Sequence, residues 1–566
     1  MKKLIFYFLA FSLLLTVSTS CKDNEEPFTE KGTLESATYN HTTKSFTLTY
    51  SSGQTETVNA VIDDFPAIPS ASATLTDGAV VYVTDASVSG NATITKEVNV
   101  VSQFVYDGMS TYYLWADEVK TKDPTVADFN PEMYFYKILN STDTQYGWSW
   151  ITDDVDALLS GFEGESTEAF GFQPLALYTD DSYTTVVGFI RYVNPGTPAE
   201  AVGLKRGEVI IKINGQTITD NNYLGLYEAN AETTFTVLDQ NFENPREVKV
   251  TPAKINTDPV LYSDVQEIDG HKIGYLFYTN FYGNYNESLY ETFSDFKAAG
   301  VTDLVLDLRY NPGGGIDAAI YLASLIAPES AVRNKEVFTI MSYNPYVNNA
   351  FDTNKWDRKD YLGDYDNTKY SDPVSANLNL NTVYVIATRS SASASELLTF
   401  CLEPYMQVEH IGEKTSGKYT ASWTIHAYND YDARVQPVYK ESSLSTKEKN
   451  TLKNWAMQPI VGRYTDKNNK DFMATNGLVP DYSVESQEYN TETWKPIGDV
   501  NDYLFAKTIS LITGQSNTAN DATSLTRRAS VPQLKEAGLY SPMESIYRDA
   551  VIIDNPKLLP PMEKGK

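Results

Sequence analysis

Residues 304–326 read LVLDLRYNPGGGIDAAIYLASLI, which predicts a strand, a tight loop and a helix in immediate succession. The apolar run at 304–308 is typical of a strand buried on both faces. The glycines at 313–315 let backbone N–H groups approach a ligand closely, and a helix is expected over 316–326. Residues 382–402 repeat this order, with a strand at 382–387, a serine-rich loop at 388–396 and a helix from Leu397. Two such units predict an α/β domain, which presents catalytic groups at strand ends.

Three neighbouring features supply the groups that acyl transfer requires. The glycine-rich loop offers backbone N–H groups. Ser393 lies at a predicted helix start, where unpaired N–H groups favour negative charge. Lys418 ends the turn GEKTSGK at 412–418, which follows a short strand at 408–411. A nucleophile, anion-stabilising amides and a base are the parts of an acyl-transfer site.

Each of these residues also has a purely structural interpretation. Ser393 and Glu396 have the spacing of a capping box, so Ser393 could serve only as a helix N-cap. Lys418 alone could be a solvated surface lysine, and Lys414 is a competing base in the same turn. The combination of the three features favours the catalytic interpretation.

Upstream of this region, residues 194–215 read NPGTPAEAVGLKRGEVIIKING and resemble a bacterial PDZ domain. The pattern predicts a short helix at 199–201 that ends by Gly203, a buried strand at 209–213, and a hairpin turn at Asn214-Gly215. The resemblance places Phe170, Gly171 and Phe172 in the loop whose N–H groups hold a peptide's terminal carboxylate. A β-sandwich fragment with an Asn-Gly turn is the alternative.

Residues 165–485 as a whole resemble the S41 peptidases, the carboxyl-terminal processing or tail-specific proteases. The matching motifs are D-x-R-x-N-x-G-G at 307–314, SASASE at 391–396 and the lysine turn at 412–418, followed by NGLVPDY at 476–482. The resemblance implies a peptidase with no metal or cofactor, in which Ser393 is the nucleophile and Lys418 the general base. It implies oxyanion donors at Gly313 or Gly314 and at Ala394. Many family members have Gln four residues after the lysine, where this chain has Ser422, the candidate third member.

The sequence therefore predicts a multidomain α+β protein. We expect a small N-terminal β-domain, which includes strands at 46–50 and 80–84, and then a helical cap segment with helices near 101–119 and 131–139. A PDZ domain, an S41 protease domain of α/β (ClpP/crotonase-like) fold with an insertion at 333–375, and a polar tail with no assigned function follow. We expect the N-terminal β-domain at 21–98, the helical cap segment at 99–164 and the PDZ domain at 165–255. The protease domain is expected at 256–515 and the polar tail at 516–566.

Residues 1–20 are expected to be a signal peptide. A short basic start precedes an apolar run at 4–17, and Ser-Thr-Ser leads to Cys21. This pattern resembles a bacterial lipoprotein signal, with cleavage before Cys21 and lipid attached to its thiol; a plain secretory signal is the alternative. The acidic residues just after Cys21 resemble a surface-export signal of Bacteroidetes lipoproteins. We expect a lipid anchor in the outer membrane, on its periplasmic face or at the cell surface.

Composition excludes several classes of protein. With 74 Asp+Glu against 45 Lys+Arg, the formal net charge is −29, which argues against nucleic acid as a partner. Two cysteines exclude a disulfide framework, and four histidines without metal-site spacing predict no zinc centre. Protein or peptide substrates are the expected partners. The alternative function is a catalytically silent lipoprotein that binds peptide tails.

Overall fold

The computed structural model describes residues 31–64, 68–179, 184–472, 476–484, 494–515, 535–536, 552–554 and 558–565. The chain forms two compact units, one within residues 31–96 and the other from residue 97 onward. The expected signal segment 1–20, Cys21 and most of the tail 516–566 lie outside the described residues. None of the described helices has both the length and the apolar content needed to cross a bilayer.

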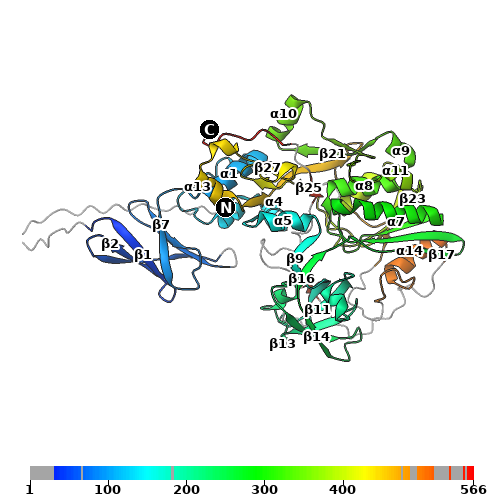
Figure 1. Ribbon diagram of the computed structural model, residues 1–566, viewed down its shortest axis with the longest axis horizontal. Helices are drawn as coiled ribbons and strands as arrows, with labels where there is room; N and C mark the ends of the chain where they lie inside the picture. The colour runs from blue at the N-terminus through cyan, green and yellow to red at the C-terminus, as the bar shows by residue number, and fades with distance from the viewer. Residues whose placement is uncertain are drawn as a thin grey trace, which may run out of the picture. The chain divides into compact units, whose positions relative to one another are not determined.

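The first unit contains seven antiparallel strands in the order β3-β2-β1-β7-β6-β5-β4 (Figure 1). Tyr39, Phe46, Leu48 and Val81 form its core. The expected strands at 46–50 and 80–84 are confirmed. In the first of them, alternating apolar residues give the strand one buried face. The bounds are β1 Leu34–Asn40, β2 Ser45–Tyr50, β3 Thr55–Asn59, β4 Val61–Asp63, β5 Ser70–Thr74, β6 Val80–Val83 and β7 Gly90–Thr95.

The second unit begins with the expected helices. The Asn130 side chain accepts hydrogen bonds from the N–H groups of Glu132 and Met133 and so caps the helix that starts at Pro131. Short strands from this segment join the rest of the unit, since β8 pairs with β28 (Ala456–Gln458). The bounds are α1 Val100–Tyr112, α2 Ala116–Val119, α3 Pro131–Ile138, α4 Ser141–Tyr146, β8 Trp150–Thr152, α5 Val155–Phe162 and β9 Glu165–Ala169.

Residues 172–250 form an antiparallel sheet in the order β15-β14-β12-β11-β10-β31. Asn214 and Gly215 have φ of 50° and 78°, as a two-residue type I′ hairpin requires, so the expected turn is confirmed. The bounds are β10 Phe172–Tyr178, β11 Val186–Val193, α6 Pro198–Ala201, β12 Val209–Ile213, β13 Gln216–Thr217, β14 Thr233–Leu238 and β15 Arg246–Val250. β31 (Lys535–Glu536) comes from the C-terminal tail.

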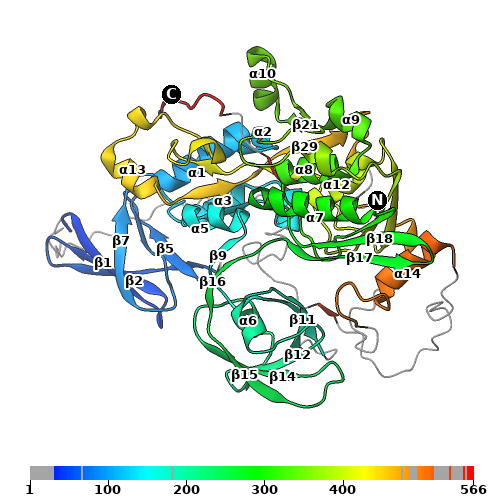
Figure 2. The same ribbon diagram turned by 45° about the vertical axis from the view of Figure 1, so that its right-hand side comes forward.

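The central sheet of the second unit has the order β17-β18-β19-β23-β24-β30, and all of its pairs are parallel except β17–β18. Figure 2 shows α7, α8 and α12 on one side of its first strands and α14 on the other. The strands are β17 Val260–Ile268, β18 His271–Tyr278, β19 Asp303–Asp307, β23 Thr382–Ala387, β24 Gln407–Gly412 and β30 Tyr482–Ser483. The helices are α7 Asn286–Ala299, α8 Ile316–Ile326, α9 Glu329–Arg333, α11 Pro373–Ala376, α12 Ala394–Leu402 and α14 Tyr503–Thr513.

A second sheet packs beside the first and has the order β20-β32-β25-β29-β21-β22. Its strands are β20 Gly314–Gly315, β32 Ile552–Ile553, β25 Thr420–Ser422, β29 Ile460–Asp466, β21 Val337–Tyr343 and β22 Lys359–Tyr361. Small strands complete the unit: β16 Ala253–Asn256 pairs with β9, and β26 Ile425–His426 pairs with both β27 Gln436–Pro437 and β28. The remaining helices are α10 Pro345–Asn354 and α13 Thr446–Leu452.

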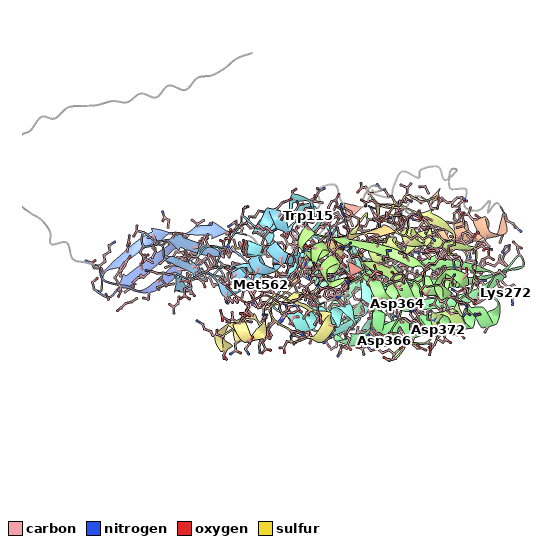
Figure 3. All side chains as sticks on the ribbon, turned by 90° about the horizontal axis from the view of Figure 1, so that it is seen from above. Trp115, Lys272, Asp364, Asp366, Asp372 and Met562 are labelled. Carbon is pink, nitrogen blue, oxygen red and sulfur yellow. The ribbon has the colours of Figure 1, made fainter. Side chains whose placement is uncertain are left out.

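Three sequence expectations differ from the structure. The region 333–375 is not wholly an insertion, because β21 lies within it and pairs with β29 along five residues. Its acidic loop, with Asp364, Asp366 and Asp372, lies at the surface (Figure 3). Helix α12 begins at Ala394, three residues before the expected start. The tail 516–566 contributes β31 and β32 to two sheets, so its described residues are structural.

Candidate active site

The four serines of the loop 388–396 differ in what their hydroxyl groups contact. Ser390 Oγ accepts a hydrogen bond from Arg191 Nη2 at 3.3 Å. Ser391 Oγ donates to Leu308 O at 2.7 Å, and Ser395 Oγ donates to Asn311 O at 2.9 Å. Both therefore hold the serine loop against the glycine-rich loop. Ser393 Oγ is fully buried and has no hydrogen-bond partner. Only the serine expected to be the nucleophile has a hydroxyl that no structural contact uses.

The backbone of Ser393 is also unusual. Its φ of 61° and ψ of −113° lie in a region that residues other than glycine rarely adopt, at a cost of about 1–3 kcal/mol. The residue sits at the N-cap of α12, but its side chain does not cap the helix. Ser393 therefore occupies the N-cap position, but its hydroxyl does not act as the cap.

Glu396 joins the serine loop to the lysine turn. Its Oε2 accepts the N–H groups of Ser393 and Lys418, each at 2.9 Å. Its Oε1 accepts the Gly417 N–H at 2.6 Å and the Thr415 hydroxyl. Burial raises the pKa of this carboxyl to about 7. The capping-box spacing pointed to the bond with Ser393, but no sequence signal indicated the bonds with the turn.

Lys418 is 1% exposed, and burial lowers its pKa to about 7. The carboxylates of Asp143 and Glu396 act against this shift. A lysine that is about half neutral at neutral pH is able to accept a proton, as a general base must. Lys414 is exposed to solvent, which removes the burial that would make it a competing base.

Asp143, a residue that the sequence did not single out, comes from α4. It is fully buried and accepts hydrogen bonds from Tyr113 OH at 2.7 Å, Ser149 N at 2.9 Å and Ser149 Oγ at 2.5 Å. Trp148 beside it packs edge-on against Tyr419, the residue after Lys418, with ring centroids 5.4 Å apart. The helical cap segment thus brings a buried carboxyl group into the surroundings of the candidate base.

The glycine-rich loop is held in a conformation that only glycine adopts readily. Gly313 and Gly314 have φ of 116° and 140°, and a Cβ at Gly314 would lie 2.4 Å from Phe281 O. Gly313 N–H donates to Asn311 Oδ1 at 2.9 Å, so this expected oxyanion donor is engaged within its own loop. The roles of Gly313, Gly314 and Ala394 as oxyanion donors stay predictions.

A buried ion cluster formed by Asp307, Arg309 and Asp502 lies next to this loop. Arg309 is fully buried between two carboxylates, with Nη2 at 2.6 Å from Asp307 Oδ2 and at 2.8 Å from Asp502 Oδ1. Tyr275 OH donates to Asp307 Oδ2 at 2.5 Å. The Asp and Arg of the D-x-R-x-N-x-G-G motif, Asp307 and Arg309, therefore stabilise the loop from the protein interior.

Ser422, the candidate third member, lies on β25 and is fully buried. Its Oγ accepts a hydrogen bond at 2.9 Å from Nε2 of Gln458, a buried glutamine on β28. Thr424 Oγ1 donates to Gln458 Oε1 at 2.7 Å and so fixes the orientation of the amide. The side chain of Gln458 on β28 thus lies beside Ser422, and no spacing in the local sequence around Ser422 could have revealed this contact.

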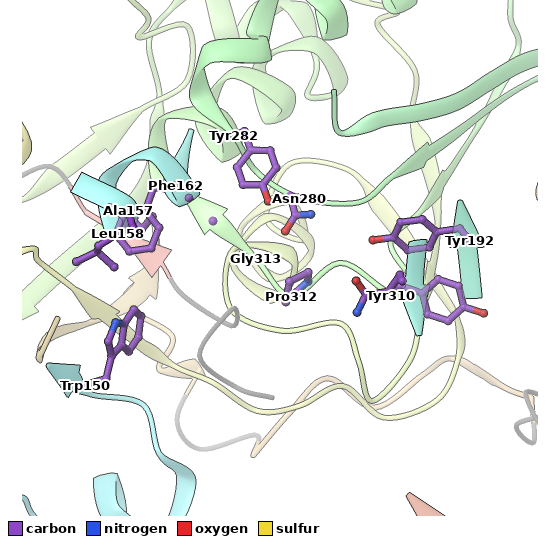
Figure 4. A pocket seen from close by; sticks show the side chains of 14 residues that line it. Trp150, Ala157, Leu158, Phe162, Tyr192, Asn280, Tyr282, Tyr310, Pro312 and Gly313 are labelled. Atoms are coloured by element: carbon purple, nitrogen blue, oxygen red, sulfur yellow. The ribbon is translucent and has the colours of Figure 1, made fainter. Parts of the chain in front are cut away.

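A cavity of about 360 Å³ opens beside the glycine-rich loop (Figure 4). Its lining includes Gly313 and Gly314, Trp150 and Phe162 from the cap segment, Tyr192 from β11, and Ile553 from the tail. The elements expected to form the catalytic, cap and PDZ parts therefore all contribute to one cavity.

The expected peptide-binding loop lies at the start of β10. The rings of Phe170 and Phe172 are buried and pack against Phe235. Gly171 has φ of 95°, and a Cβ there would lie 2.2 Å from Thr197 Cβ. Since the side chains belong to the core, carboxylate recognition at this loop would have to use the backbone N–H groups.

Three family profiles match the chain: residues 272–484 match peptidase family S41, residues 101–150 the peptidase S41 N-terminal domain, and residues 189–237 a PDZ domain. The chain contains a peptidase family S41 domain. The expected combination of a cap segment, a PDZ domain and an S41 domain is thereby confirmed, and the helices α1–α4 belong to the S41 N-terminal domain.

Relatives and one solved structure agree with this assignment. A carboxyl-terminal-processing protease of Picosynechococcus is 29% identical over 40% of this chain and 49% of its own length. A probable CtpA-like serine protease of Staphylococcus aureus is 24% identical over 54% of this chain and 52% of its own. The chain thus matches about half the length of these curated relatives. An S41 protease structure from Bacteroides fragilis has a TM-score of 0.54 and 25% identity, covering 73% of this chain and 98% of that one.

Proposed function

We propose that this protein is a serine endopeptidase in which Ser393 is the nucleophile and Lys418 the general base. The observation that carries the proposal is that the Ser393 hydroxyl is buried without a hydrogen-bond partner while burial lowers the pKa of Lys418 to about 7. Glu396 bonds the N–H groups of both residues and so fixes their backbones relative to each other.

In the proposed mechanism, neutral Lys418 takes the proton of Ser393 Oγ as that oxygen bonds to the peptide carbonyl carbon. The resulting ammonium then protonates the leaving amine as the C–N bond breaks, which leaves an acyl-enzyme. Water next attacks the ester, Lys418 takes its proton, and Ser393 recovers a proton as the carboxylic acid leaves. Backbone N–H groups near Gly314 and at Ala394 would hold the oxyanion, and one such donor is worth about 3–4 kcal/mol.

Labelling with a serine-directed acylating probe tests this proposal. We expect the parent protein to be labelled and to hydrolyse peptides. Ser393→Ala should lose both properties, with a fall in turnover of at least about 10³-fold, and Lys418→Ala should be as inactive. Lys414→Ala is the matched control and should keep activity. Unchanged turnover in Ser393→Ala would contradict the proposal.

The alternative function is a catalytically silent protein that binds peptide tails. The absence of Gln at position 422 favoured this alternative, but Gln458 of β28 donates a hydrogen bond to Ser422 Oγ, which weakens that argument. A parent protein that binds peptides, is never labelled and never cleaves them would establish the silent alternative.

We also propose that the PDZ domain recruits substrates through their free C-terminus. In this mode the peptide adds as a strand to the domain, and backbone N–H groups near Phe170, Gly171 and Phe172 bond its carboxylate. Titration of the full-length Ser393→Ala protein with paired peptides, free acid and amide, tests it. Equal affinity for both peptides would reject carboxylate recognition.

For the N-terminus we propose a lipid anchor on Cys21 in the outer membrane. The proposal rests on the sequence pattern around residues 1–21. Metabolic labelling with a radioactive fatty acid should mark the parent protein and not Cys21→Ala, and the variant should leave the membrane fraction. Equal labelling of both proteins would reject the anchor.

A further inference from the structure

The C-terminal tail pairs with the sheet of the PDZ domain. β31 lies antiparallel to β10, with Leu177 opposite Glu536 and Tyr178 opposite Lys535. β11 occupies the other side of β10, so β31 covers the free edge of this strand at Leu177 and Tyr178. PDZ domains bind peptides by adding a strand to a sheet edge. Over its two residues β31 runs antiparallel to β10, which is the direction expected of a bound peptide.

The same tail returns as a strand in the candidate active site. β32 lies between β20 of the glycine-rich loop and β25, the strand that follows Lys418. Ile552 is opposite Gly314, and Ile553 is opposite both Gly315 and Ser422. On its other side the glycine-rich loop is bonded to Phe281, whose carbonyl accepts the Gly315 N–H at 2.7 Å. Neither side of β20 is open for an extended peptide.

Asp554 holds this strand in place. Its carboxylate accepts hydrogen bonds from Tyr343 OH at 2.5 Å and from Trp423 Nε1 at 2.8 Å. Its N–H donates to Ser422 O at 3.2 Å. Further along, Leu559 exchanges two hydrogen bonds with the Gln436 amide, at 2.9 and 3.0 Å.

Two features of the site itself belong to a closed state. Ser393 is 0% exposed, so no substrate carbonyl reaches its hydroxyl without a rearrangement. The Gly313 N–H is bonded to Asn311 Oδ1 and is not directed at an oxyanion. The glycine-rich loop pairs with β32 through Gly314 and Gly315, and the serine loop is hydrogen-bonded to the glycine-rich loop through Ser395.

We propose that the C-terminal tail is an intramolecular ligand of both strand-binding sites, which keeps the protease closed until an extended peptide substrate displaces it. The inference rests on the proposed peptidase function and adds its regulation. It also names the ligand class of the slot between β20 and β25: an extended peptide with an acidic residue at the position of Asp554, where Tyr343 OH and Trp423 Nε1 donate to the carboxylate.

Two full-length variants test the proposal. Ile553→Pro removes the N–H group needed for strand pairing, and Asp554→Asn replaces the carboxylate between two donors by an amide. We expect both to react with the serine-directed probe, and to cleave peptides, about ten-fold faster than the parent. Asp364→Asn, which alters an exposed carboxylate of the same unit, should behave like the parent.

A peptide with the sequence of residues 548–558 provides the second arm. It should slow the labelling of Asp554→Asn, and a scrambled peptide should not. If Ile553→Pro and Asp554→Asn are labelled more slowly than the parent while their melting temperatures are unchanged, β32 is a structural part of the active site and the proposal is wrong. Equal labelling rates would show that the tail does not gate access and would likewise overturn it. Absence of labelling in every protein, the parent included, would instead refute the peptidase function. Should Ile553→Pro fail to fold, Asp554→Asn decides.

Discussion

Ser391, Ser393 and Ser395 look equivalent in the sequence, yet each has a different role in the structure. The outer two donate hydrogen bonds to carbonyl groups of the glycine-rich loop, while Ser393 Oγ has no partner. A buried hydroxyl without a partner costs free energy. Such a cost is understandable where the hydroxyl is reserved for substrate.

The flanking serines should therefore affect stability more than chemistry. Each of the two carbonyls keeps a backbone donor, so Ser395→Ala removes one hydrogen bond and should lower the free energy of unfolding by about 0.5–1.5 kcal/mol. Ser391→Ala also leaves the Thr388 N–H without its acceptor, and we expect a loss of about 1–3 kcal/mol. Urea unfolding measures this loss. Probe labelling at low temperature should remain in both variants, in contrast to Ser393→Ala. Complete inactivity of a stable Ser391→Ala protein would place the nucleophile elsewhere.

The pH dependence of activity follows from Lys418. Its pKa is lowered to about 7 by burial, and only the neutral amine accepts a proton. As pH rises through about 7 the neutral fraction increases, so kcat/KM should rise about ten-fold per pH unit below 7 and level off above it. A profile of kcat/KM between pH 5 and 9 measures this rise, which is the acid limb of the profile. Activity that is flat across this range would remove Lys418 as the base.

A substitution of Asp143 provides a more direct test of Lys418 as the base. Its carboxylate favours the ammonium form of Lys418, so Asp143→Asn should lower the pKa of Lys418 and move the acid limb to lower pH. Asp117→Asn, an exposed carboxylate of the same segment, should leave the limb in place. A variant that loses activity without any shift of the limb would mean that Asp143 has only a packing role.

At the scale of elements, the glycine-rich loop depends on what lies beneath it. β19 ends in Asp307, and two residues later Arg309 is buried between Asp307 and Asp502. Asp502 caps α14 and so connects this helix to the loop. Burial of a charge is tolerated only when partners and hydrogen bonds compensate.

Removing Arg309 should therefore destabilise the central domain. Arg309→Ala leaves two buried carboxylates without their cation, and we expect a loss of about 3–5 kcal/mol in the free energy of unfolding. Arg333→Ala removes an exposed ion pair with Glu329 and should cost no more than about 0.5 kcal/mol. Thermal and urea unfolding of the two variants gives the comparison. Similar losses in both would contradict the structural role of the cluster.

At the scale of the second unit, the PDZ domain contacts the protease domain through Arg206. Its Nη1 donates to Tyr310 OH at 2.8 Å, and its guanidinium lies over the Trp494 ring at 4.5 Å from the centroid. Tyr310 belongs to the glycine-rich segment, and Arg206 also lies 4.0 Å from Asp502. Arg206 thus links the PDZ domain to the glycine-rich segment. Arg191 of the same domain does so too, with its guanidinium over the Tyr310 ring and a hydrogen bond to Ser390 Oγ at 3.3 Å.

Arg206→Lys should weaken this link, because a lysine lacks the planar fork of donors and stacks less well on aromatic rings. We expect kcat/KM for a protein substrate with a free C-terminus to fall about ten-fold. Probe labelling of Ser393, which needs no recruitment, should change less than three-fold, and Arg246→Lys within the PDZ domain is the control. Equal losses in both assays would show that Arg206 only stabilises the fold.

The sequence by itself determined the elements whose cause is local. The apolar run before Gly313, the capping Asn130, and the Asn214-Gly215 turn each specify their own backbone conformation, and the structure has them at the expected places. The motifs at 307–314, 391–396 and 412–418 likewise identified the S41 domain. Short-range chemistry is enough for such predictions, because the interacting groups lie within a few residues of one another.

Only the tertiary structure decided which distant groups meet. The bonds from Glu396 to the lysine turn, the burial of Asp143 near Lys418, and the amide of Gln458 at Ser422 join residues that are 19 or more positions apart. The two strands of the tail are each two residues long, too short for any periodic pattern. They form because open sheet edges offer backbone hydrogen bonds to whichever segment the fold brings alongside, and this requirement leaves no signature in side chains.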